Sequence, residues 1–224
     1  MKLSNDILTT AFHTTGMSAS NQVERIIDLV KINGATSIID RSTVAGTLAV
    51  ESLLLGYDPR DVAETVFENC QEISLDVYCA KRSFGDRDAR LAGMSAEIAV
   101  HGLLWWGIKT NPNFGRYTRI SAINEDASKE FGLKDGYDIV FRTDRRRHRI
   151  QIKSNPDEAE FSNRYTNDVV VTSPAQLLGD RQAQTNDLHE AIISEDYDVL
   201  AGAVNRFTQI LYTQKASNGR RKVI

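Results

Sequence analysis

Two short, strand-like stretches, GYDIVFRT and RHRIQIKS, carry an acid, an amide and a lysine on either side of a basic turn. Their alternation of apolar and polar residues is typical of an antiparallel hairpin. A turn centred on Arg145 and Arg146 would place Asp138 opposite Lys153, and alternation would put Gln151 on the same face. Carboxylate and amide oxygens bind hard divalent cations, and an ammonium group opposes negative charge. Together these residue types indicate chemistry at an anionic centre such as a phosphate.

The opposite face of this hairpin is apolar and predicts where the core lies. In the same register this face carries Ile139, Phe141, Ile150 and Ile152. On the polar face Arg142 would oppose Arg149, a like-charge pair that costs stability unless an anion or solvent separates the two charges. A bound phosphate would satisfy that pair.

The hairpin follows a helix-forming stretch, ARLAGMSAEIAVHGLLWWG, that is apolar on most faces. We expect this helix to end at Gly107 and to pack against the core. Glu97 lies at its middle, where a carboxylate either contributes to the site or pairs with an arginine. His101, one turn later, is expected to be a core histidine. Trp105 and Trp106 are expected to belong to the core rather than to a base-stacking platform.

Helical patterns fill the first third of the chain, including one opened by Asp58 and Pro59, and strand patterns follow the helix described above. Strands are predicted at RYTRISAI, YDIVFRT, HRIQIKS and DVVVTS, a helix at SPAQLLGDRQAQTNDLHEAII, and further strands at YDVLAGAV and TQILYT. This order predicts an α+β protein. Residues 1–85 would form a helical region for dimerisation or DNA recognition. Residues 86–224 would form a mixed β-sheet core flanked by helices, with a basic tail.

The composition of the chain limits the classes of protein it can belong to. The chain has 224 residues, of which 41% are hydrophobic and 25% charged, enough for a sizeable core. Its net charge of -3 means that contact with nucleic acid must come from a local basic patch. No apolar run approaches the roughly 18 residues of a membrane span, and no secretory signal is recognisable, so we expect a cytoplasmic protein. Cys70 and Cys79 are predicted in one helix about 13 Å apart, too far for a disulfide, and are expected as free thiols.

The combination of Asp138, Gln151-x-Lys153 and an upstream Glu97 resembles the active site of the restriction-endonuclease-like nucleases, the PD-(D/E)-x-K superfamily. In that family an acid on one strand, an acid-x-lysine on the neighbouring strand and often a glutamate on the preceding helix surround a divalent metal at the scissile phosphate. The resemblance covers roughly residues 86 to 205 of this sequence. It implies a restriction-endonuclease-like core.

Two positions depart from the family pattern. Tyr137 stands where proline is common, and Gln151 stands where an acid is usual. Some members carry glutamine at the second position, and its amide oxygen would bind a metal more weakly than a carboxylate does. An inactivating substitution would look the same in the sequence, so both origins of Gln151 stay open.

The resemblance implies a metal-dependent DNA endonuclease. Mg²⁺, with Mn²⁺ as a substitute, would be held by Asp138, Glu97, Gln151 and the backbone carbonyl of Ile152, and Lys153 would position or deprotonate the attacking water. Double-stranded DNA would be contacted by basic side chains, namely Arg142, Arg145, Arg146, Arg147, Arg149, Arg220, Arg221 and Lys222. The length favours a type II restriction endonuclease acting as a homodimer. The alternatives are a homing endonuclease, a Holliday-junction resolvase or a repair nuclease of the same fold, and a catalytically silent DNA-binding protein.

Each feature also has a simpler structural explanation. Asp138 and Lys153 could form only a cross-strand ion pair, and the arginine run could be a solvated turn. The stretch STVAGTLAVESLLLG is a weak match to part of a helix-turn-helix. The chain has no phosphate-binding loop, paired-cysteine zinc pattern, H-E-x-x-H or G-x-S-x-G motif, which argues against the enzyme classes that depend on them. The metal-site hypothesis is favoured because the three elements occur together and in the expected order.

Overall fold

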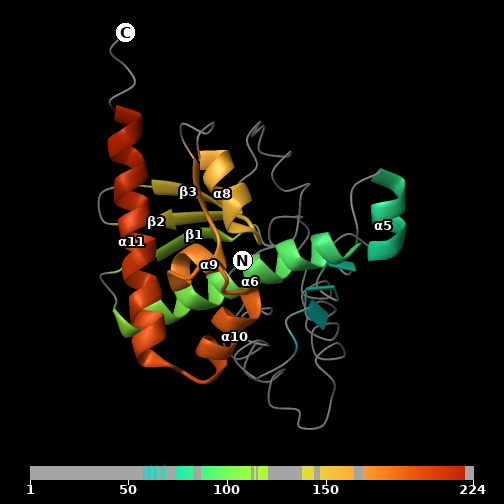
Figure 1. Cartoon of the computed structure of the whole chain (residues 1–224), viewed down its shortest axis with the longest axis horizontal. Helices are drawn as coiled ribbons and strands as arrows, with labels where there is room; N and C mark the ends of the chain where they lie inside the picture. The colour runs from blue at the N-terminus through green and yellow to red at the C-terminus, as the bar shows by residue number, and fades with distance from the viewer. Residues whose placement is uncertain are drawn as a thin grey trace, which may run out of the picture.

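Two helices, three strands, a helix, a strand and three helices follow one another along the part of the chain that the computed structural model describes (Figure 1). The described residues are 74–82, 87–111, 116–120, 138–143, 147–163 and 169–219, with single positions between 58 and 68 and at 114. The elements in chain order are α5 (Leu75–Arg82), α6 (Arg87–Thr110), β1 (Arg116–Ile120), β2 (Ile139–Arg142), β3 (Arg147–Ile152), α8 (Pro156–Asn163), β4 (Val169–Thr172), α9 (Pro174–Leu178), α10 (Thr185–Ile193) and α11 (Tyr197–Gly219).

Several predicted features lie outside the described residues. They are the helices before Asp58, the helix-turn-helix candidate, Cys70, Tyr137, Arg145, Arg146, Arg220, Arg221 and Lys222. Asp58 itself caps a helical turn as predicted, because its Oδ1 accepts from the backbone N–H of Arg60 at 2.8 Å and of Asp61 at 3.2 Å. In the described part of the chain, no helix is both long and apolar enough to cross a membrane.

The four strands form one mixed sheet in the order β1-β2-β3-β4. The first three strands are antiparallel to their neighbours, and β4 is parallel to β3. A parallel pair needs a crossover connection, and α8 lies within this one. All four strands form where the sequence predicted them, and the protein is of the α+β class.

The register of β2 against β3 differs from the prediction by two residues. Ile139 lies opposite Ile150 and Arg142 lies opposite Arg147, so the predicted pairing of Arg142 with Arg149 is wrong. Arg149 faces Val140 instead. A shift of two leaves every side chain on its predicted face, because strand side chains alternate with period two. The cross-strand pairing of Asp138 with Lys153 was predicted from the same incorrect register, so it is withdrawn with it.

The two faces of the sheet pack against different helices. The described side chains of the apolar face are buried, as predicted, and share one core with α6, α10 and α11 through Ile139, Phe141, Ile150, Ile152 and Val170. The other face meets α8, whose Ala159 packs with Val169 and Val171 of β4. Figure 1 shows α6 running beneath the strands and α8 above them. Ala63, Phe67 and Leu75 also belong to the larger core, so described residues from both predicted domains pack together, and the boundary at residue 85 stays a prediction.

Helix α6 does not end at Gly107, as the sequence suggested, but continues to Thr110. The Oγ1 of Thr110 donates to the carbonyl of Trp106 at 2.9 Å within the last turn. Gly107 serves close packing instead of a stop, since a Cβ there would lie 2.8 Å from Cε1 of Phe114 and 3.1 Å from Cγ2 of Val204. Those two neighbours bring the loop after α6 and helix α11 against the same turn.

We therefore expect Gly107→Ala to lower the free energy of unfolding by about 1–3 kcal/mol, the usual cost of inserting a methyl group into a filled space. Gly93→Ala is the matched control in the same helix, because nothing lies within 4 Å of its added Cβ. That control should gain up to about 1 kcal/mol from helix propensity alone. Urea unfolding of both variants measures the difference. A stabilised Gly107→Ala would mean that Phe114 and Val204 are not packed this closely.

The predicted strands YDVLAGAV and TQILYT are wrong, because both lie within the single helix α11. Over residues 197–213 as a whole, the apolar residues Leu200, Ala203, Phe207 and Leu211 are at helical spacing, and all four are buried. The helix also has a start signal at Asp196, whose Oδ1 accepts from the N–H of Val199 at 3.2 Å. The prediction of strands relied on short runs of strand-forming residues, whereas the helical spacing is visible only over the longer segment.

The long helix predicted at SPAQLLGDRQAQTNDLHEAII is two helices. Helix α9 begins at the cap Ser173 and ends at Gly179, whose φ of 76° is left-handed. The carbonyls of Leu177 and Leu178 at this end accept hydrogen bonds from Arg206 of α11. Helix α10 then begins at Gln184 with a capping box. Gly179 was the sequence signal for the break.

Candidate metal site at the end of strands β2 and β3

Asp138 lies immediately before β2 and is attached to β3 by two hydrogen bonds. Its Oδ2 accepts from the backbone N–H of Ile152 at 2.6 Å. Its own N–H donates to the carbonyl of Ile150 at 2.8 Å. Both bonds hold the carboxyl group at the end of β3, beside the residue that follows it, Lys153.

The environment of Asp138 makes its negative charge costly. Burial raises the pKa of Asp138 from 3.8 to about 6, although the hydrogen bond from Ile152 and the charges of Lys153 and Arg90 act to lower it. A carboxyl group with a raised pKa and two cations nearby is common at functional sites. A simple surface ion pair would not raise the pKa of its carboxyl group in this way.

Gln151 and Lys153 reach the site from the end of β3. Gln151 is partly buried and pairs with Val171 of β4. Since Ile150 and Ile152 face the larger core, alternation turns Gln151 to the face that α8 covers. Lys153 follows the strand, is also partly buried, and its N–H donates to the carbonyl of Thr172 at 2.9 Å. This main-chain bond fixes where the lysine leaves the sheet.

Glu97 lies on a stripe of α6 that also carries Arg90, Met94 and His101, since these residues are spaced by three or four positions. Met94 and His101 are buried and Glu97 is partly buried. Burial lowers the pKa of His101 to about 3, so its imidazole is neutral, as predicted for a core histidine. Helix α6 covers the apolar face of the sheet, opposite to Gln151. Glu97 and Gln151 can meet at one ion only around the end of the sheet, where Asp138 lies.

The donor set suits a hard cation but is short of charge. Within the described ranges, no three His, Cys, Asp or Glu residues gather into a metal-binding group. The predicted ligands are the carboxylates of Asp138 and Glu97, the amide oxygen of Gln151 and the backbone carbonyl oxygen of Ile152. All are oxygen ligands, which Mg²⁺ and Mn²⁺ accept. Such a set fits Mg²⁺ with weak affinity.

The predicted DNA-binding arginines are only partly placed. Arg149 is partly buried within β3. The backbones of Arg142 and Arg147 form the last pair of the β2–β3 ladder, next to the turn.

Trp106 belongs to the core, as predicted. It is buried and packs edge-on against Tyr197 with ring centroids 5.5 Å apart.

Sequence reasoning missed Arg90. Its guanidinium lies 5.7 Å from the ring centroid of Phe67 and 5.9 Å from that of Tyr78, and its charge acts on Asp138. The available signal was its position seven residues before Glu97, on the same stripe of an otherwise apolar helix.

Comparisons with protein-family models, with curated proteins and with solved structures found no significant match to this chain.

The raised pKa of Asp138 predicts a stability difference that needs no metal. Because the folded pKa exceeds the unfolded value, the folded state binds the extra proton between about pH 4 and 6, and this stabilisation is lost as the pH rises through that window. Asp138→Asn has no such proton. The free energy of unfolding of the variant, minus that of the natural protein, should therefore rise by up to about 3 kcal/mol from pH 4 to pH 7 in EDTA. A constant difference across this range would contradict the buried environment of Asp138.

Proposed function

We propose that the protein is a metal-dependent DNA endonuclease with a restriction-endonuclease-like core, acting as a homodimer on double-stranded DNA. The observation that supports this most is the contact of Asp138 with the N–H of Ile152, which places an acid beside a Gln-x-Lys strand end. The order of elements agrees with the family pattern, since α6 with Glu97 precedes the two neighbouring strands. Among enzymes of this kind, the narrower proposal is a type II restriction endonuclease.

The residues of the chain would divide the reaction between them. Asp138, Glu97, Gln151 and the carbonyl of Ile152 would hold Mg²⁺. When bound, this ion neutralises phosphoryl charge and acidifies a coordinated water. Lys153 would orient the attacking water or take its proton, and would oppose the negative charge that builds on the phosphate. Arg90 would keep Asp138 ionised when DNA brings further negative charge, because its own charge lowers the pKa of that carboxyl group.

A catalytically silent DNA-binding protein is the second candidate. Two cations already lie near Asp138, and Gln151 supplies no charge, so the attraction for a divalent ion is reduced. Such a protein would bind DNA through the same surface without cutting it.

Incubation with supercoiled plasmid and Mg²⁺ separates these candidates. We expect linear product with ends at fixed sequences, which fits a restriction or homing enzyme. Preference for branched DNA would instead indicate a resolvase, and preference for damaged DNA a repair nuclease. DNA binding without cleavage in either Mg²⁺ or Mn²⁺ would indicate the catalytically silent DNA-binding protein.

Gln151→Glu tests whether glutamine is native to the active protein. If the site is adapted to glutamine, a third carboxylate should tighten Mg²⁺ binding but disturb Lys153 and the water, so cleavage should fall or stay level. If glutamine is an inactivating change, the same variant should restore cleavage from nearly nothing. We expect the first result, because an amide oxygen is a usable ligand and the neighbouring cations offset phosphate charge. A gain of a hundredfold or so, about 2.7 kcal/mol of barrier, would contradict it. Cleavage rates of both proteins on one substrate are the measurement.

A further inference from the structure

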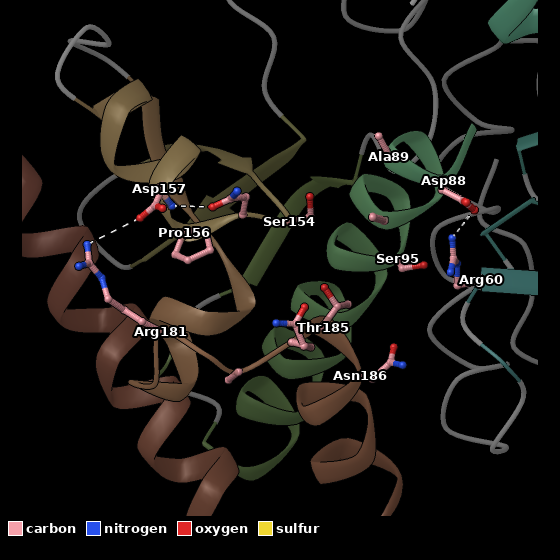
Figure 2. Close-up of a pocket in the computed structure, with 14 residues that line it drawn as sticks. Arg60, Asp88, Ala89, Ser95, Ser154, Pro156, Asp157, Arg181, Thr185 and Asn186 are labelled. Carbon is pink, nitrogen blue, oxygen red and sulfur yellow. Dashed lines mark hydrogen bonds and ion pairs between the residues drawn. The ribbon is translucent and has the colours of Figure 1, made fainter. Parts of the chain in front are cut away.

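A cavity of about 750 Å³ opens beside the segment that follows Lys153. Its lining includes Ser154 and Asn155 after β3, the first half of α6, and the start of α10 around Thr185. Figure 2 shows these side chains arranged around one hollow, with Arg60 toward one end and Arg181 toward the other. Ser154 directly follows Lys153 in the chain, so the lining of the cleft starts one residue after the candidate metal site.

The lining of the cleft is polar. Among the described residues, its apolar contacts come from alanines and one proline, while hydroxyl, amide and arginine side chains, with the carboxylates Asp88 and Asp157, make up the remainder. Such a lining suits a ligand that carries many hydrogen-bonding groups. Arginine, Ser, Thr and Asn side chains and the first turns of helices are the groups that contact the sugar–phosphate backbone of nucleic acids.

Ser95 gives an independent sign that the cleft receives a polar ligand. Its residue lines the cleft and is only 3% exposed. Its Oγ has no hydrogen-bond partner among the described residues. Buried hydroxyl groups are nearly always hydrogen-bonded, so an oxygen of a bound phosphate or sugar would complete this one.

The two arginines are held in exposed ion pairs that a phosphate can replace. Arg60 pairs with Asp88 at 2.8 Å, and Arg181 pairs with Glu160 at 2.6 Å and with Asp157 at 3.9 Å. Exposed ion pairs of this kind contribute little to stability. Arginine–phosphate pairs are frequently bidentate and stronger. Both arginines can therefore turn to a phosphate without a large loss.

We infer that this cleft binds the sugar–phosphate backbone of the DNA strand that passes the metal site, with Arg60 and Arg181 as phosphate contacts. The inference rests on the proposed function, since that function supplies the strand. It adds an interface between the segment after β3, the first half of α6 and the start of α10, at the opposite end of β3 from the basic turn.

The test is the salt dependence of binding to a labelled DNA duplex, measured by fluorescence anisotropy in EDTA so that nothing is cut. The double variant Arg60→Gln/Arg181→Gln should weaken binding roughly tenfold to a hundredfold at low salt and lower the log–log slope by about two. Arg87→Gln/Lys109→Gln removes the same charge from side chains outside the cleft lining, and should change the slope little. Asp88→Asn, which releases Arg60, should tighten binding severalfold.

Two results would overturn the inference: a cleft double variant with the same slope as its control, or weaker binding by Asp88→Asn. DNA cleavage is measured in a separate experiment with Mg²⁺, so the proposed nuclease activity and the proposed cleft can be contradicted independently. A protein that cuts, but whose cleft variants match the control, loses only the cleft. A protein that never cuts, but whose cleft variants lower the slope as expected, loses only the nuclease activity. If the natural protein binds no DNA, both proposals are wrong.

Discussion

Asp138→Asn is expected to abolish Mg²⁺-dependent cleavage of DNA, with a loss on the order of a thousandfold or more. The variant removes the negative charge that would hold the ion. Asparagine retains an oxygen that can accept the hydrogen bond from Ile152, whereas alanine would leave that N–H without its acceptor. Asparagine is therefore the cleaner test, and DNA binding in EDTA should stay near the natural level. Initial cleavage rates on plasmid, with a parallel anisotropy titration, measure both effects.

The control for this variant is Asp198→Asn, which makes the same change of charge at an exposed position in the first turn of α11. It should cut at the natural rate. If Asp138→Asn also cuts at that rate, the metal site has been assigned to the wrong residues. If both variants lose activity together, the loss reflects overall charge and not a ligand.

Lys153→Met is expected to reduce cleavage at least about a hundredfold while leaving the melting temperature within a few degrees of the natural value. Methionine retains much of the length of the side chain and removes its charge. The main-chain bond from residue 153 to Thr172 does not involve the side chain, so the strand end should be unchanged. Because the charge of Lys153 lowers the pKa of Asp138, the variant should also shift the pH at which Mg²⁺ begins to bind to a higher value.

Lys109→Met provides the matched control, since this lysine is exposed and lies at the far end of α6 over the ring of Trp105. Its activity should be unaffected. A Lys153→Met protein that still cuts but melts much earlier would support the alternative in which Asp138 and Lys153 only stabilise the hairpin.

Much of the sheet could be predicted from the sequence because its signals are local. The strands around Asp138 and Lys153 alternate with a clear period of two, and their buried face was assigned correctly. The register was not, because it depends on where the turn closes, and several positions in a run of arginines satisfy the same alternation.

Features that depend on distant contacts were harder to predict. Gly107 looked like a helix stop, yet it is kept small by Phe114 and Val204, which the sequence gives no reason to bring together. Helix α11 was taken for strands, since its period is visible only over its full length. The action of Arg90 on Asp138 requires α6 to lie across the sheet, and no local pattern reveals that packing.

The hydrogen bond between Asp138 and Ile152 joins residues only 14 positions apart. Closing so short a loop costs little chain entropy, and hairpins of this kind form within microseconds. The acid, the amide and the lysine should thus come together early in folding, before α11 docks against the sheet. In hydrogen exchange, the amide of Ile152 is then expected to remain protected in partially unfolded forms in which α11 has already opened.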